Sequence, residues 1–144
     1  MTDHDAQRKN RQVDDTWPPD AHPYSPTSEA GGFVFVSGSL SIDPSGAPVA
    51  GRSEAVVAAT ERLRDRLATA GLDLRDVIKT TYFVTDVTLR DETNLHDERT
   101  FAAPRPARTF VEVSRLPYGA TVEIEAVAYR NPNRARKGAL RDPA

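Results

Sequence analysis

Apolar and polar positions follow two different periods along the chain, and these periods predict both helices and strands. Between residues 53 and 70, apolar residues recur every three or four positions, which is the spacing of one helix face. A second helix is predicted over residues 88–101, although its apolar stripe is thin. Runs rich in β-branched and aromatic residues predict strands over residues 33–38, 77–85, 108–114 and 121–130. The order of these elements predicts one α+β domain.

Turn and capping residues support the limits of the first helix. Ser53 stands where a side chain can cap the helix N-terminus. Gly71 follows the last periodic residue, where a helix end favours a residue that can adopt positive φ. Upstream, residues 43–46 read Asp-Pro-Ser-Gly, a sequence typical of a tight turn.

The faces of the predicted strands indicate self-association. Two helices can cover only one face of a sheet of this size. Residues 33–36, however, are apolar at every position, so both faces of that strand favour burial. In a chain this short, another copy is the cover that we expect for the second face. The sequence therefore predicts a homo-oligomer with a mixed sheet and two helices on one face of each subunit.

Composition limits the class of protein. The chain has 144 residues, 38% of them apolar and 28% charged, which is typical of a soluble globular domain. No apolar run approaches the length needed to span a bilayer, and the N-terminal residues lack the apolar stretch of a secretory signal. We therefore expect a cytoplasmic protein. The absence of cysteine excludes disulfides, thiolate nucleophiles and zinc–cysteine sites.

Both ends of the chain are polar and carry opposite charge. We expect a flexible tail over residues 1–18, a folded domain over 19–130 and a basic tail over 131–144. A basic tail can attract nucleic acid, but no aromatic residues are interleaved with these charges to stack on bases. This composition argues against nucleic acid as a partner.

Two charged residues on predicted strands are the main candidates for chemistry. Glu123 alternates with Val122 and Ile124, so it points away from the helices and toward the expected interface. Partial burial there would raise the pKa of the Glu123 carboxyl unless a cation stands nearby. Arg108 is the candidate cation, because its planar guanidinium binds a carboxylate through two parallel hydrogen bonds. Two other interpretations stay open: a structural ion pair between these residues, or a solvated Glu123.

Other side chains carry weaker signals. Tyr24 is either a turn aromatic or a hydroxyl that lines a pocket, and Asn94 is either a surface residue or a ligand-binding one. The histidines are far apart in the sequence, and none has the spacing of metal ligands, so no metal site is expected.

Several short motifs occur in one order from about residue 24 to residue 129. They are Pro23-Tyr24-Ser25, Phe35-Val36-Ser37-Gly38, Phe83-Val84-Thr85-Asp86, Pro106-Ala107-Arg108-Thr109, Leu116-Pro117 and Ile124-Glu125-Ala126. No single motif is specific, but their order over the chain is. Through these motifs the chain resembles the reactive intermediate deaminase family (RidA, also called YjgF-like).

The resemblance implies a fold, an assembly and a reaction. The implied subunit is a RidA-like (chorismate mutase-like) α+β fold, assembled as a homotrimer around a central barrel, with clefts for small carboxylates between subunits. The implied reaction is the hydrolysis of 2-imino acids, which arise from 2-enamino acids, to 2-oxo acids and ammonia, with neither metal nor organic cofactor. By this resemblance Arg108 binds the substrate carboxylate and Glu123 positions the attacking water. The residues that the resemblance places along the cleft are Tyr24 (from a neighbouring subunit), Gly38, Phe110 and Asn94.

The chain also departs from the family pattern. Phe110 stands where many deaminase members have cysteine, and the segment between Asn94 and Pro106 is a few residues short. These departures leave the natural substrate open. The alternatives are an enzyme dedicated to one pathway intermediate, a non-catalytic module that senses 2-oxo acids, and an RNA-acting protein.

Overall fold

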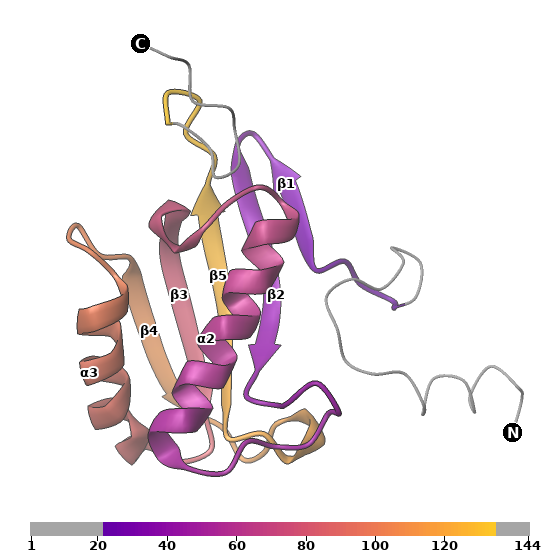
Figure 1. Ribbon diagram of the computed structural model, residues 1–144, viewed down its shortest axis with the longest axis vertical. Coiled ribbons are helices and arrows are strands. Elements are labelled where there is room, and N and C mark those ends of the chain that lie inside the picture. Colours follow the sequence, from indigo (N-terminus) through magenta and orange to yellow (C-terminus); the bar gives the residue numbers. More distant parts are fainter. Residues whose placement is uncertain (1–21, 135–144) are drawn as a thin grey trace, which may run out of the picture.

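The fold is that of a computed structural model, and residues 22–134 are the part of the chain that it describes (Figure 1). Five strands form one mixed sheet in the order β1-β2-β5-β3-β4. The strands are β1 (Thr27–Ala30), β2 (Phe33–Leu40), β3 (Val77–Val84), β4 (Ala107–Glu112) and β5 (Val122–Tyr129). The helices are α2 (Arg52–Thr69) and α3 (Arg90–Thr100), with single 3-10 turns at Leu74–Asp76, Val87–Leu89 and Pro117–Gly119. Most of the two predicted tails lies outside the described residues.

Strand pairing sets which residues lie side by side. β5 is central and pairs antiparallel with β2 on one side and with β3 on the other. β4 pairs parallel with β3, and the chain between them contains α3. β1 forms a hairpin with β2 through Gly31 and Gly32, which both adopt positive φ.

Both helices pack on the same face of the sheet, as Figure 1 shows. The core lies between this face and the helices. It is built from alternate strand residues and from the apolar stripe of α2, chiefly Val34, Tyr82, Ile124, Ala126, Val56, Leu63 and Leu67. None of the helices in the described part of the chain is long and apolar enough to cross a membrane.

The predicted elements are confirmed, with two corrections. Ser53 does not cap α2: the helix begins one residue earlier, after Gly51, and has no side-chain cap. Gly51 has a φ of +94°, so the chain enters the helix through a conformation that glycine adopts easily. Strand β1 was not predicted, because its four residues are mostly exposed and polar and so give no alternating signal. At the other end of α2, Gly71 has the expected positive φ.

The thin apolar stripe of α3 also has a structural explanation. The buried residues of this helix are polar, Thr93 and Asp97. Thr93 donates its hydroxyl hydrogen to the carbonyl oxygen of Leu89, and Asp97 accepts a hydrogen bond from the sheet. The helix therefore contacts the sheet partly through hydrogen bonds.

Within residues 22–134, no helix lies over the second face of the sheet. Large apolar side chains on this open face are exposed: Phe33, Phe35, Val111 and Tyr129. This confirms that the strands carry apolar residues on both faces, and the homo-oligomer remains a prediction.

Two adjacent valines of α2 test the placement of the core. Val56 is fully buried, whereas Val57 is 44% exposed. Val56→Ala should lower the free energy of unfolding by about 2 kcal/mol, because it leaves a cavity in a packed core. Val57→Ala should change it by less than about 0.5 kcal/mol, since alanine also favours the helix. Chemical denaturation at one protein concentration measures both; equal losses would contradict this placement of α2.

Candidate functional site

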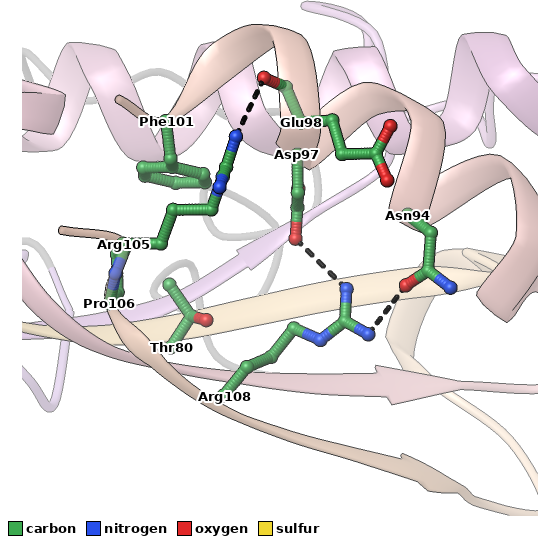
Figure 2. Close-up of a pocket in the computed structure, with 8 residues that line it drawn as sticks. All are labelled: Thr80, Asn94, Asp97, Glu98, Phe101, Arg105, Pro106 and Arg108. Atoms are coloured by element: carbon green, nitrogen blue, oxygen red, sulfur yellow. Dashed lines mark hydrogen bonds and ion pairs between the residues drawn. The ribbon is translucent and has the colours of Figure 1, made fainter. Parts of the chain in front are cut away.

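Arg108 is held by two side chains of α3. It lies on β4 opposite Thr80 of β3 and points toward the helices. One terminal nitrogen donates a hydrogen bond to Asn94 Oδ1 at 2.6 Å, and the other donates to Asp97 Oδ2 at 3.2 Å (Figure 2). The side chain is 22% exposed, so the ion pair with Asp97 is largely shielded from water.

Two aromatic rings lie beneath this guanidinium. Its carbon atom is 5.6 Å from the ring centre of Phe110 and 5.9 Å from that of Tyr82. The Tyr82 hydroxyl donates to Asp97 Oδ1 at 2.8 Å. Burial, together with the Asp97 charge, raises the pKa of Tyr82, so its hydroxyl stays protonated and remains a donor. Asp97 thereby links the sheet, α3 and Arg108 in one network.

A pocket of about 280 Å³ opens beside Arg108. Figure 2 shows Thr80, Phe101 and Arg105 around it, with Asn94 and Asp97 above the guanidinium. A guanidinium has five N–H donors, and the bonds to α3 use only two of them. The remaining donors can bind a small carboxylate, which would share the charge of Arg108 with Asp97.

Glu123 lies on the open face of the sheet. Its neighbours along β5, Val122 and Ile124, are buried under the helices, so Glu123 points the other way. The side chain is half-buried, and this desolvation raises the pKa of its carboxyl. The positive charge of Arg66 opposes that rise, whereas the neighbouring Glu125 adds to it.

The Glu123 carboxylate rests against the backbone of Gly38. A Cβ at position 38 would collide with Oε1 of Glu123, so only glycine permits this approach. Gly38 lies where the pairing of β2 with β5 shifts register, between Val36 and Ser39, and forms a β-bulge with Ser37.

Arg108 and Glu123 do not meet within one chain. They point to opposite faces of the sheet, and β3 runs between their strands. An ion pair between them within one chain is therefore wrong, because the carboxylate partner of Arg108 is Asp97. Their convergence across two chains stays a prediction.

The other candidates divide between the same two places. Asn94 and Phe110 lie against Arg108, so Asn94 is not the isolated surface residue that one interpretation allowed. Tyr24 is 49% exposed and contacts the ring of His22. Tyr24 precedes Ser25, whose carbonyl oxygen accepts a hydrogen bond from the Ser37 hydroxyl. Tyr24 therefore lies near the Ser37–Gly38 bulge and not in the Arg108 pocket.

Sequence reasoning missed three side chains, Asp97, Tyr82 and Arg66. Asp97 lies three residues after the candidate Asn94 on a predicted helix, a spacing that places both on one face, and this signal was available. Tyr82 gave only the signal of a core aromatic. Arg66 interrupts the apolar stripe of the first helix between Leu63 and Leu67, which also marks it as unusual. Within residues 22–134, the structure contains no group of three histidine, aspartate or glutamate side chains placed to bind a metal.

Comparison with known proteins places this chain in a family. The sequence profile described as endoribonuclease L-PSP matches residues 16–130. A RutC family protein of Pyrococcus horikoshii is 39% identical over 110 residues, which are 75% of this chain and 87% of that protein. The 2-iminobutanoate/2-iminopropanoate deaminase of Salmonella typhimurium is 37% identical over 112 residues, which are 75% of this chain and 88% of the relative.

A solved structure is also similar to this chain in fold and sequence. Escherichia coli TdcF with bound serine superposes with a TM-score of 0.68 at 30% identity, covering 83% of this chain and 98% of TdcF. The chain belongs to the RidA (YjgF-like) family.

The hydroxyl of Tyr82 tests the network around Asp97. Tyr82→Phe removes one donor from a buried carboxylate and should lower the free energy of unfolding by about 1 to 2 kcal/mol. Tyr118→Phe is the matched control, because Tyr118 is 59% exposed, and it should leave stability unchanged. Thermal and chemical denaturation measure both. A Tyr82→Phe protein as stable as wild type would show that this hydrogen bond contributes nothing.

Proposed function

We propose that this protein hydrolyses 2-imino acids, formed from 2-enamino acids, to 2-oxo acids and ammonia. The observation that carries the proposal is Arg108, whose guanidinium is fixed by Asn94 and Asp97 and keeps unused donors at a small pocket. Membership of a family with relatives named 2-iminobutanoate/2-iminopropanoate deaminase supports the same reaction. The bound serine of TdcF, an amino acid with a carboxylate, is a ligand of the expected kind.

In the proposed mechanism, Arg108 binds the substrate carboxylate and Glu123 positions a water molecule. The protonated imine carbon is already electrophilic, so the water oxygen adds to it while Glu123 accepts a proton from the water. Glu123 then passes this proton to the amino group of the tetrahedral intermediate. The C–N bond breaks with its electron pair going to nitrogen, so that ammonia leaves, and Glu123 takes up the hydroxyl proton as the carbonyl of the 2-oxo acid forms. Release of that proton to water regenerates the carboxylate. Fixing the substrate in front of this water lowers the entropic part of the barrier.

The proposed site is completed by a second copy of the chain. Within one chain, the residues of the open-face side, Gly38 and Glu123, are separated from the Arg108 pocket by the sheet itself. A neighbouring subunit that packs on the open face would bury Phe35 and Val111 and bring its own half of the site. We propose a homotrimer with such shared sites, in which Tyr24 lines the cleft from the neighbour. Phe110 and Asn94 would contact the substrate beside Arg108.

Substitutions at the two charged residues test the reaction. An amino-acid oxidase generates 2-imino acids, and the protein should accelerate the loss of the imine signal. Arg108→Ala should lower kcat/KM by at least about 10²-fold, because one charge-assisted bidentate contact is lost. Glu123→Gln should lower kcat by about 10²- to 10⁴-fold while the affinity for a 2-oxo acid is retained. Arg115→Ala, an exposed arginine just beyond β4, is the control and should match wild type.

Wild-type protein that leaves the spontaneous rate unchanged with several imino acids would refute the enzymatic proposal. A second function, binding of 2-oxo acids without turnover, is favoured by one observation: residues of a single chain line the Arg108 pocket and hold its guanidinium. In that case calorimetry should detect 2-oxobutanoate binding that Arg108→Ala abolishes, with Glu123→Gln unchanged and no imine hydrolysis by wild type.

A further inference from the structure

A charged side chain is buried in the apolar face of α2. Arg66 is only 2% exposed and lies between Leu63 and Leu67 in sequence, both of which belong to the core. A guanidinium removed from water is costly unless its donors are satisfied. The buried Arg66 side chain therefore requires hydrogen-bond acceptors for its donors. The mechanism proposed above does not use this residue.

Among the described residues, Arg66 donates hydrogen bonds to two consecutive backbone carbonyls of β2. One terminal nitrogen donates to the oxygen of Gly38 at 2.6 Å and to that of Ser37 at 3.0 Å. These residues form the β-bulge, where the register between β2 and β5 shifts. A regular strand would pair such carbonyls with the next strand, so the guanidinium replaces ladder hydrogen bonds that the bulge gives up.

The same bulge supports Glu123. The carboxylate of Glu123 lies against Gly38, so closely that a Cβ there would collide with it. Arg66 thus contacts Gly38 through its carbonyl oxygen, and Glu123 contacts Gly38 at its α-carbon. The buried cation and the half-buried carboxylate are separated by one residue of backbone.

The other charged groups near Glu123 can be named. Glu125 on β5 points to the same face, and Lys79 of β3 lines a hollow of about 360 Å³ beside Glu125. At the positions paired with Glu123, β2 and β3 carry Leu40 and Phe83, which do not titrate. Among the described residues, Arg66 is the cation whose charge acts on Glu123.

We propose that Arg66 is a positioning residue for Glu123: it holds the Ser37–Gly38 bulge on which the carboxylate rests and places a buried positive charge behind it. The importance of Arg66 for catalysis rests on the proposed function, because Glu123 must be ionised in that mechanism to accept a proton from water. Burial raises the pKa of Glu123 and Arg66 lowers it, so loss of the Arg66 charge should raise that pKa further. The ionised form would then be lost at a higher pH.

The direct test is a titration of Glu123 itself. Carbon-13 NMR of labelled glutamate side chains, with the Glu123 signal assigned from Glu123→Gln, gives its titration midpoint in the folded full-length protein. Arg66→Met should move this midpoint to higher pH by about one unit. Arg66→Lys keeps the charge and should restore most of the wild-type value. Arg64→Met removes an exposed charge from the same helix and should leave the midpoint unchanged.

Arg66→Gln covers the possibility that Arg66→Met fails to fold. Glutamine keeps a donor for the two carbonyls without the charge, so the midpoint should rise as in Arg66→Met. A folded Arg66→Gln or Arg66→Met protein with the wild-type Glu123 midpoint would overturn the proposal.

The pH dependence of kcat/KM separates this inference from the proposed function. In Arg66→Met or Arg66→Gln, the acidic limb of imine hydrolysis should move to higher pH by the same amount as the Glu123 midpoint. A structural role alone would lower stability without moving either quantity. If wild type does not hydrolyse imines, the proposed function fails, and the NMR midpoint still decides the role of Arg66. If wild type does hydrolyse them and neither quantity moves, the inference fails and the function stands.

Discussion

A β-strand sends successive side chains to opposite faces of its sheet, and the helices in the described part of this chain cover one of the two faces. This constraint places Arg108 in a pocket under α3 and Glu123 on the open face. Each residue is well positioned within its own half of the molecule. Because the sheet separates them, a site that uses both needs two copies of the chain, and the exposed apolar side chains of the open face provide a surface for that contact.

The electrostatics of the two halves differ. Arg108 is paired with Asp97 in a shielded network, so the substrate carboxylate of the proposed reaction would meet a positive charge that is already largely balanced. Hydrogen-bond geometry, set by Asn94 and by the donors left free, would then contribute more to recognition than net charge. Glu123 has no side-chain partner of this kind among the described hydrogen bonds. Its charge state depends on burial, on Glu125 and on the buried Arg66.

Much of the fold follows from periodicity in the sequence. The apolar stripe of α2 and the alternation in β5 predicted both the elements and the directions of Glu123 and its neighbours. β1 escaped prediction because a short polar edge strand is defined by pairing and not by burial. The start of α2 depends on the positive φ of Gly51, which outweighs the capping preference of Ser53.

The candidate site was predictable only in part. Arg108 and Glu123 stood out by residue type and through the family resemblance. The direction of the Glu123 side chain could be derived from the sequence, because apolar residues alternate along β5. The direction of Arg108 could not, since β4 has little apolar alternation to orient it. The sequence places Asp97 on one helix face with Asn94 and places Arg66 within an apolar stripe, but the burial of both side chains required the tertiary structure, because a charged residue in a helix is usually solvated.

Complementation between two inactive chains measures most directly whether the site is shared. Arg108→Ala and Glu123→Gln chains, with different tags, are co-expressed and the mixed oligomers are purified through both tags. If one chain supplies Arg108 and its neighbour supplies Glu123, one of the three sites in each mixed trimer has both residues intact, so the mixed trimers should show about a third of the wild-type rate of imine hydrolysis. If both residues act within one chain, mixed oligomers will be as inactive as either variant alone, and that result would contradict the shared site.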